Sequence, residues 1–343
     1  MRVGLTGVGR IGQLHATNLA ATAGVTEIVL HDPVPGRAAE VAAAVAAGAG
    51  GTATPAVTAV GSGDGSYAEL LSRVDAVMVT TPTPAHADAV LAALDAGVAT
   101  LVEKPLAGDA ETMAVLIERA ERPGTAPLLV GFQRRFDPGI AELKRRIATG
   151  EIGDLYVVRA SAFDAVPPPA EYIPTSGGIF RDMFIHDLDC VPWLVGRPVV
   201  QVHAVGSVLV DQAFADAGDV DTAAITLVFE GGVIAQIAGG RRQGTGYDNR
   251  IEAAGSKAAL ASGWDDRTPV ISLEVGGHHP GDHAYDGFQA RYARAYAAEV
   301  ATFLEVAAGR AENPSPARDS LVSLALAEAC EASLRSGVPV RLR

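Results

Sequence analysis

The stretch Val3-Gly4-Leu5-Thr6-Gly7-Val8-Gly9-Arg10-Ile11-Gly12 lies at the start of the chain and decides its fold. Its first four residues form a short, mostly apolar run, which predicts a buried strand. A glycine turn of the form GxGxxG follows this strand. A helical pattern begins directly after the turn. In such a unit Gly7 permits the tight turn, Gly9 lets a pyrophosphate approach the backbone and Gly12 lets the helix pack on the strand.

A second strand, Glu27 to Leu30, leads to Asp32, which lies 20 residues beyond the last glycine of the turn. An acidic side chain at this position can accept hydrogen bonds from the adenosine ribose hydroxyls and repel a 2′-phosphate. At the start of the helix, Arg10 and Ile11 offer unpaired backbone N–H groups to phosphates. The sequence therefore predicts NAD as cofactor, while Arg10 and Arg37 leave NADP possible but less favoured.

Strand and helix patterns keep alternating up to residue 131, with strands at 75–80, 100–102 and 128–130 and helices at 85–96 and 109–122. This alternation predicts a parallel, doubly wound sheet, in which ligands bind beyond the carboxyl ends of the strands. Polar clusters follow those strand ends. The residues there that we assign to the cofactor are Thr80, Thr81, Pro82, His86, Glu103 and Lys104.

Lys104 is the most informative of these residues. An ammonium group beside the nicotinamide can donate a hydrogen bond to the reacting oxygen and stabilise its alkoxide character as the hydride leaves. The alternative is a surface lysine before a proline turn. For His86 we favour a packed or solvated side chain, because a single histidine on a helix is more often structural than catalytic.

The pattern changes after a helix at 138–149. Runs of near period two predict strands at 155–163, 199–205, 222–229, 233–238, 250–254 and 270–274. The short turns between them indicate a large, mostly antiparallel, open sheet. Helical spacing returns at 288–308 and 316–336, and residues 339–342 could form a closing strand. The predicted fold class is therefore α/β: an N-terminal Rossmann sheet and a C-terminal α+β domain.

A chain of 343 residues exceeds the limit of about 250 to 300 residues for one hydrophobic core, so at least two domains are expected. We expect residues 1–131 to form the NAD-binding Rossmann domain. Residues 132–310 should form the domain for substrate binding and oligomerisation. Residues 311–343 should supply a C-terminal helix and a strand that return to the Rossmann domain.

The stretch from Gly177 to Asp189, GGIFRDMFIHDLD, is the candidate catalytic segment. If residues 182–189 are helical, Asp182 and His186 share one face, with Cβ atoms about 5 to 6 Å apart. The carboxylate could then orient and charge-stabilise an imidazole that moves a proton. The alternative is an ordinary ion pair on the surface of a capped helix.

A loop near the end of the second domain contains His278, His279, Asp282 and His283. A metal could use this spacing, but no glutamate or further histidine is placed on a helix with these residues, and glycine-rich loops hold ligands poorly. We therefore expect no metal site, and these histidines could instead form a substrate rim. Tyr247 precedes a strand, where its hydroxyl could face a polyol or be buried for structural reasons.

Composition restricts the class of partner. The chain has 27 Lys and Arg against 40 Asp and Glu, a net charge of −13, which argues against nucleic acid or an anionic membrane as a partner. Cys190 and Cys330 have no CxxC spacing and fit a reducing cytoplasm. No run is long and apolar enough to span a bilayer, and no signal-type segment begins the sequence. We expect a cytoplasmic protein that acts on a small molecule.

Five stretches spread along essentially the whole chain together resemble one family. They are the glycine turn, Glu103-Lys104-Pro105, residues 131–136, the segment 177–189 and residues 288–299. It is the glucose-fructose oxidoreductase, inositol dehydrogenase and MocA (Gfo/Idh/MocA) family, and the resemblance is strongest to its inositol 2-dehydrogenase branch. The resemblance implies NAD-dependent oxidation of a ring secondary alcohol of a cyclitol, foremost myo-inositol to 2-keto-myo-inositol. It also implies a homotetramer or dimer.

By the same resemblance, Lys104, Asp182 and His186 are the catalytic residues. The implied substrate-binding residues are Lys104, Arg134, Asp164, Asp182, His186 and Tyr247. One departure concerns the strand before the proline-rich loop, which ends Ser161-Ala162-Phe163-Asp164 where the branch places a histidine. Reaction type is therefore better specified than substrate. A dehydrogenase of pyranoses or glycosides and a non-catalytic NAD-responsive regulator remain alternatives.

Overall fold

The computed structural model of this chain describes residues 1–48, 55–63 and 65–342. It divides into two compact units. The first comprises Met1–Phe136 and Ala295–Leu321, and the second comprises Asp137–Arg294 and Val322–Arg343. This division differs from the expected one, because a segment from late in the chain completes the first unit.

The first unit contains a six-stranded parallel sheet in the order β3-β2-β1-β4-β5-β6. Its strands are β1 (Arg2–Thr6), β2 (Glu27–His31), β3 (Ala56–Ala59), β4 (Ala76–Val79), β5 (Ala99–Glu103) and β6 (Leu128–Gly131). Its helices are α1 (Arg10–Ala21), α2 (Arg37–Gly48), α3 (Ser66–Arg73), η1 (Thr83–Ala85), α4 (His86–Asp95), α5 (Ala110–Ala120), η2 (Gln133–Phe136) and most of α11 (Ala293–Ala307). The strand order reverses direction at β1, so the predicted doubly wound sheet is confirmed.

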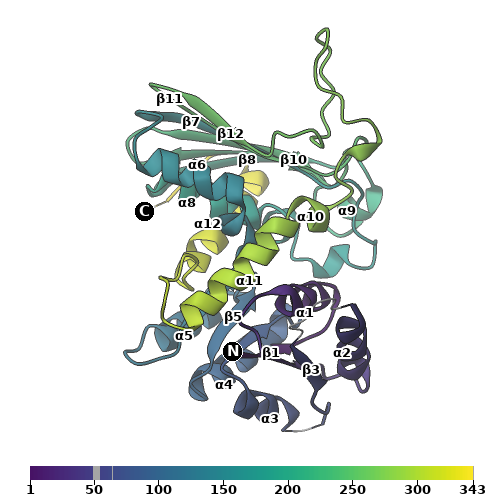
Figure 1. Cartoon of the computed structure of the whole chain (residues 1–343). Coiled ribbons are helices and arrows are strands. Elements are labelled where there is room, and N and C mark those ends of the chain that lie inside the picture. Colours follow the sequence, from purple (N-terminus) through teal and green to yellow (C-terminus); the bar gives the residue numbers. More distant parts are fainter. Residues whose placement is uncertain (49–54, 64, 343) are drawn as a thin grey trace. The chain divides into compact units, whose positions relative to one another are not determined.

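Helices flank this sheet in Figure 1, and apolar side chains pack on both of its faces. On one face Leu5 packs in a cluster with residues of α1, α2 and α11, including Leu19 and Phe303. On the other face Val77 packs in a second cluster with Leu70 and other residues of α3 and α4. Strands buried on both faces explain the continuous apolar runs of the sequence.

The second unit contains a seven-stranded sheet in the order β12-β11-β7-β10-β9-β8-β13. Its strands are β7 (Leu155–Phe163), β8 (Val199–Ser207), β9 (Thr222–Phe229), β10 (Ile234–Gly240), β11 (Asp248–Gly255), β12 (Ala259–Ser262) and β13 (Val340–Arg341). Its helices are α6 (Pro138–Ala148), η3 (Ile173–Thr175), α7 (Ile179–Asp182), α8 (Ile185–Val195), α9 (Gln212–Asp216), η4 (Gly281–His283), α10 (Phe288–Arg291) and most of α12 (Asp319–Ser336). Among the described strands of this second sheet, only β7 and β10 pair in parallel, so the prediction of a mostly antiparallel sheet is confirmed.

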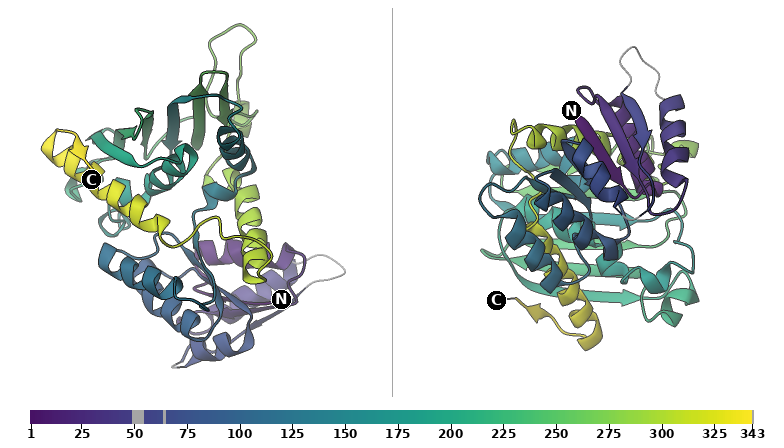
Figure 2. Two further views of the ribbon diagram at one scale, coloured as in Figure 1. Left: turned by 90° about the vertical axis from the view of Figure 1, so that its left-hand side faces the viewer. Right: turned by 90° about the horizontal axis from the view of Figure 1, so that it is seen from below.

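Burial alternates along the strands of this second sheet. In β10, Ala235 and Ile237 are buried, whereas Ile234 and Gln236 are exposed. Helices α6 and α8 lie against strands of the sheet, and the strands form one broad layer beside them (Figure 2). One face is therefore covered by helices and the other is open, as the sequence predicts.

Two predicted strands differ from the structure. Residues 270–274 are not a strand but part of the long loop between β12 and α10, which projects beyond the sheet in Figure 1. There the backbone N–H of Ser272 donates to the carbonyl of His278 at 2.8 Å, so the segment folds back on itself and Leu273 stays exposed. The closing strand β13 pairs with β8 of the second unit and does not return to the first sheet.

Candidate active site

The glycine turn between β1 and α1 is shaped for close approach of a ligand. Gly7 has a φ of +89°, and a Cβ there would lie 2.6 Å from the backbone nitrogen of Thr81. A Cβ on Gly12 would collide with the carbonyl oxygen of Gly7. Gly9, which precedes Arg10 at the start of α1, has no described heavy atom within 4 Å of such a Cβ and makes no side-chain cap. The turn therefore fits a dinucleotide pyrophosphate on its open side.

Asp32 lies just past β2, is buried, and holds this turn in place. Its Oδ2 accepts a hydrogen bond from the backbone N–H of Val8 at 2.8 Å, and its Oδ1 accepts one from Val34 at 2.9 Å. Each carboxylate oxygen has a further lone pair. Asp32 can therefore brace the turn and also accept from a ribose hydroxyl, and the sequence predicted only the second role.

The loop after β4 braces the turn from the other side. The hydroxyl of Thr80 donates to the first carbonyl of the glycine turn at 2.6 Å, and Pro82 leads into η1. The buried ring of His86 lies between two carbonyl oxygens, 2.8 Å from that of Thr81 and 2.9 Å from that of Pro105. The Thr81 hydroxyl oxygen is buried and has no hydrogen-bond partner among the described residues, so it suits a polar group of the cofactor.

Lys104 follows β5 directly, at the carboxyl edge of the sheet where ligands bind in this fold. Its backbone N–H donates to Oε2 of Glu103 at 3.2 Å. The other oxygen of that carboxylate, Oε1, lies 2.8 Å from Nε2 of His15 on α1. Glu103, predicted to contact the cofactor, is thus an internal brace between the lysine backbone and α1.

In the second unit, the predicted catalytic segment is not one continuous helix. Helix α7 ends at Asp182 and α8 begins at Ile185, although Met183 and Phe184 keep right-handed helical backbone angles. The N–H of Phe184 donates to the carbonyl of Ile179, five residues back, at 3.0 Å. This turn is wider than an α-helical turn, so the condition for a shared helical face, an uninterrupted helix over 182–189, is not met.

The structure shows what holds Asp182. Its Oδ1 accepts from the hydroxyl of Tyr172 at 3.0 Å, and its Oδ2 accepts from Nη2 of Arg241 at 2.8 Å. Arg241, directly after β10, is buried and also donates to Asp164 at 3.4 Å. Burial opposes the charge of this guanidinium, but the two carboxylates outweigh burial and raise its pKa. Tyr172 and Arg241 could not be found from the sequence, because neither lies in a recognisable motif.

Arg241 thus joins two of the predicted substrate residues, Asp164 and Asp182. Arg134 is buried in η2 of the first unit, and Tyr247 is buried just before β11 of the second. The buried position of Tyr247 agrees with the structural alternative for this side chain.

Asp219 is a further residue of this region that no sequence motif indicates. Its Oδ1 accepts from the backbone N–H of Ile179 at 3.1 Å, at the start of α7. The preceding Gly177 and Gly178 have φ values of +85° and +90°, which favour glycine. Asp219 therefore fixes the turn from which the predicted catalytic segment begins.

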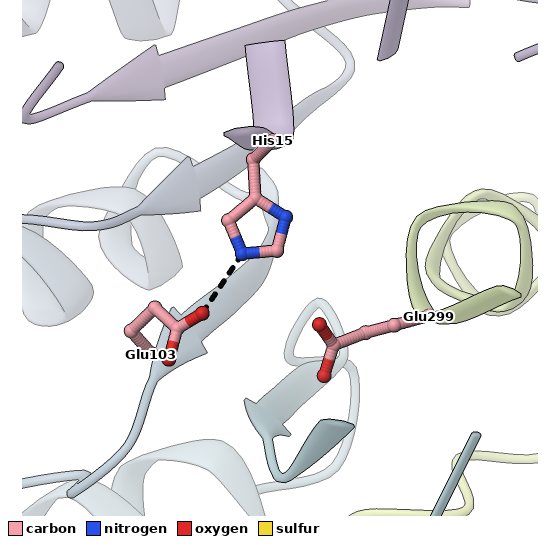
Figure 3. A group of neighbouring side chains, drawn as sticks. All are labelled: His15, Glu103 and Glu299. Atoms are coloured by element: carbon pink, nitrogen blue, oxygen red, sulfur yellow. Dashed lines mark hydrogen bonds and ion pairs between the residues drawn. The ribbon is translucent and has the colours of Figure 1, made fainter. Parts of the chain in front are cut away.

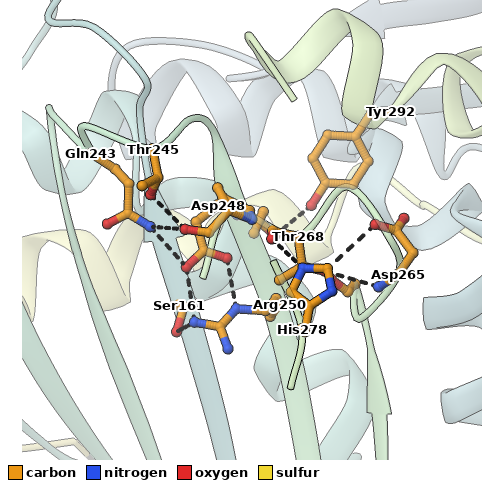
Figure 4. A network of polar contacts seen from close by, with 12 residues as sticks. Ser161, Gln243, Thr245, Asp248, Arg250, Asp265, Thr268, His278 and Tyr292 are labelled. Carbon is orange, nitrogen blue, oxygen red and sulfur yellow. Dashed lines mark hydrogen bonds and ion pairs between the residues drawn. The ribbon is translucent and has the colours of Figure 1, made fainter. Parts of the chain in front are cut away.

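His278, His279 and His283 lie in the loop between β12 and α10, and the side chains of the first two make separate contacts. The Nε2 atom of His278 lies 2.8 Å from the carbonyl of Thr268, beside a polar network in which Asp248 pairs with Arg250 (Figure 4). His279 accepts a hydrogen bond from a backbone N–H at 3.0 Å. Among the described residues, the side chains close enough to share a metal are instead His15, Glu103 and Glu299.

The doubly wound sheet, the open glycine turn and the lysine at its carboxyl edge are those of an NAD-binding oxidoreductase. Two family models agree. The one described as "Oxidoreductase family, NAD-binding Rossmann fold" matches residues 1–132, and the one described as "GFO/IDH/MocA C-terminal domain" matches residues 140–261. The chain belongs to the Gfo/Idh/MocA family, as its motifs predicted, and is an NAD-dependent oxidoreductase that acts on a CH–OH group.

Similar proteins cover the whole chain. It is 40% identical over 344 residues to myo-inositol dehydrogenase Hyg17 of Streptomyces leeuwenhoekii, and the match covers 99% of each chain. It is 37% identical over 335 residues to the inositol 2-dehydrogenase of Rhizobium meliloti (strain 1021), and this match covers 97% of each chain. The crystal structure of a myo-inositol dehydrogenase from Corynebacterium glutamicum ATCC 13032 matches with a TM-score of 0.85 and 34% identity, covering 100% of this chain and 99% of that one.

Proposed function

We propose that this protein oxidises a ring secondary alcohol of a cyclitol, with myo-inositol to 2-keto-myo-inositol as the favoured reaction. The observation that carries the proposal is the hydrogen-bonded pairing of Asp182 with the buried guanidinium of Arg241 at 2.8 Å. A carboxylate held in the charged form can stabilise an imidazolium. The names of the two relatives and of the solved structure support a cyclitol as the substrate.

In the proposed mechanism His186 takes the proton from the ring hydroxyl. Asp182 orients the imidazole and stabilises its positive charge, and Lys104 stabilises the negative charge that develops on the reacting oxygen. The glycine turn and Asp32 would hold NAD in the first unit, where the cofactor would supply the hydride acceptor for the carbinol carbon.

The first experiment is NADH formation by the purified protein with NAD or NADP and myo-inositol, beside scyllo-inositol, glucose and a simple glycoside. NAD-linked turnover of an inositol supports the proposal. Turnover of a pyranose alone would favour the second candidate, for which the departure at Phe163-Asp164 is the specific observation. Binding of NAD without turnover of any alcohol would favour a regulator and contradict the proposed reaction.

The role of His186 has a direct test. Replacing a positioned acid–base group typically lowers the rate about 100- to 10,000-fold, so His186→Ala should lose activity by that factor and still bind NAD. His203→Ala, on β8 of the same unit, is a matched control and should retain activity. Near-normal turnover by the His186 variant would remove this residue from the mechanism.

We also propose that a second copy of the chain covers the open face of the second sheet, giving a homo-oligomer, a tetramer or a dimer. Val205 and Ile234 point to that face and are 52% and 40% exposed. Exposed apolar patches on a sheet commonly mark protein interfaces. Light scattering should give a multiple of the 35.1 kDa chain mass, and the double variant Val205→Lys, Ile234→Lys should lower it. A monomeric wild-type protein at micromolar concentration would contradict the proposal.

The helices bear on membrane spanning, and the cysteines on the redox environment of the protein. No helix within the described ranges is long and apolar enough to cross a membrane. Cys190 and Cys330 are buried and not joined in a disulfide. We propose a cytoplasmic location on the basis of these thiols.

A further inference from the structure

Three titratable side chains meet inside the first unit (Figure 3). His15 on α1, Glu103 at the end of β5 and Glu299 on α11 each place an atom within 4.8 Å of the other two. Glu299 is fully buried, and Figure 3 shows its carboxyl group turned toward the other two side chains. Neither of its oxygens has a hydrogen-bond partner among the described residues. A buried carboxylate without a donor is strongly disfavoured.

The two carboxyl groups of the cluster receive unequal numbers of donors. Glu103 accepts from the backbone N–H of Lys104 at 3.2 Å and faces Nε2 of His15 at 2.8 Å, so that Nε2 carries the hydrogen of this contact. The Nδ1 atom of His15 is buried and has no partner within the part of the chain that the structure describes. A second proton on the ring would be buried without an acceptor. Glu103 therefore receives the donors of the cluster and is the better site for negative charge.

Two carboxylates this close together in a buried site do not both ionise, because their charges repel. Desolvation of Glu299, and secondly the charge of Glu103, raise the pKa of the Glu299 carboxyl group well above its usual value. Tyr296, from the same helix, packs edge-on to His15 with ring centroids 5.6 Å apart. Lys104, the next residue after Glu103, donates a hydrogen bond to the Glu103 carboxylate from its backbone N–H.

A metal ion is a weaker interpretation of the same cluster. A histidine that binds a metal through one ring nitrogen almost always donates from the other to a neighbouring acceptor. The Nδ1 atom of His15 has no such neighbour among the described residues, and its Nε2 already faces Glu103. The geometry favours a proton over a metal.

We infer that Glu299 is a buried carboxylic acid, that Glu103 carries the single negative charge of the cluster, and that Glu103 acts as a positioning residue for Lys104. The neutral Glu299 and the hydrogen bond from His15 keep the negative charge on Glu103. The inferred protonation state of Glu299 does not depend on the proposed reaction. The effect on Lys104 chemistry rests on the proposed function.

Infrared spectroscopy tests the protonation state directly. At pH 8 the wild-type protein should show the C=O stretch of a protonated carboxyl group, and Glu299→Gln should lack it. Glu312→Gln, which changes an exposed glutamate of the same unit, is the matched control and should keep the band. Absence of the band from the wild type, or its persistence in Glu299→Gln, would overturn the inference. So would a stoichiometric divalent metal in the purified wild type that Glu299→Gln loses.

Unfolding gives a second readout that does not depend on activity. Glu299 keeps its proton in the folded state, whereas the unfolded chain releases it above the ordinary pKa of 4.5. The folded state then binds more protons, so the free energy of unfolding should fall as pH rises. Glu299→Gln should remove this part of the slope. An identical slope in the variant and the wild type would contradict the inference.

Kinetics test the positioning role. Glu103→Gln keeps the side-chain shape and removes the charge, and it should lower kcat about 10- to 100-fold with little change in the KM for the alcohol. Glu299→Gln mimics the neutral acid and should stay close to wild type. Equal losses in both variants would mean a structural role only. If no alcohol is turned over, the proposed function fails, but the infrared result still decides the protonation state.

Discussion

The glycine turn of the first unit and the Asp182 region of the second are held in different ways. The turn is fixed by backbone sterics: a Cβ at Gly7 or Gly12 would collide with neighbouring backbone atoms. Asp182 is fixed by side chains, from Tyr172 ten residues earlier and Arg241 59 residues later. A site built from backbone leaves a contiguous motif in the sequence, whereas a site built from distant side chains does not.

The largest effect should come from removing the side-chain support of the second region. Arg241→Met leaves Asp182 and Asp164 without their shared cation, and breaking such a buried pair costs about 3 kcal/mol, the lower end of the usual range because Asp164 is partly exposed. Urea unfolding measures this loss. Arg159→Met is the control: its pair with Glu252 on the same sheet is exposed, with N–O 3.6 Å, and should contribute less than about 1 kcal/mol. Equal losses in the two variants would mean that burial of the Arg241 pair has no energetic role.

Substitutions of two glycines in the first region should affect fold stability and NAD binding separately. Gly12→Ala forces a methyl group against the carbonyl of Gly7 and should destabilise the fold by about 2 to 3 kcal/mol. Gly9→Ala meets no described atom within 4 Å, so it should fold normally and weaken NAD binding instead. Thermal unfolding and NADH fluorescence titration measure the two effects. A lower stability of Gly9→Ala than of Gly12→Ala would contradict this assignment of the two glycines.

A smaller, pH-dependent effect is expected at His31, at the end of β2. Its ring contacts the hydroxyls of Thr6 at 2.7 Å and Ser66 at 3.0 Å, and burial lowers its pKa below the ordinary 6.5. As pH falls through 6.5 the unfolded chain takes up a proton that the folded chain does not, so the free energy of unfolding should fall. His31→Gln should flatten this slope between pH 7 and 5. A steeper dependence of the free energy of unfolding on pH in the variant would contradict the lowered pKa of His31.

Several features could be predicted from the sequence because they depend on local order. The alternation of apolar strands and helices predicted the Rossmann sheet, and the spacing from the glycine turn predicted Asp32. The second sheet was predicted by its period-two runs. Residues 270–274 misled the prediction because alternation indicates a strand only where one face is buried, and Leu273 is exposed.

Other features could not be read in this way. The pairing of Asp182 with Arg241 depends on how α7 and the end of β10 come together within the second unit. The turn at Met183 and Phe184 is closed by backbone hydrogen bonds from both residues to the carbonyl of Ile179, which leave no side-chain pattern in the sequence. The cluster at Glu299 joins residues from three elements, and no local spacing connects them.

The late segment that completes the first unit has a consequence for synthesis of the chain. Val300, Phe303, Leu304 and Val306 belong to the same apolar cluster as Val3 and Leu5. Domains usually fold as they emerge from the ribosome, N-terminal first. Here the first sheet must wait with one apolar face incomplete until about residue 306 has been made, after all but the last strand of the second sheet. The nascent protein therefore has a long interval in which its cofactor-binding half needs protection from aggregation.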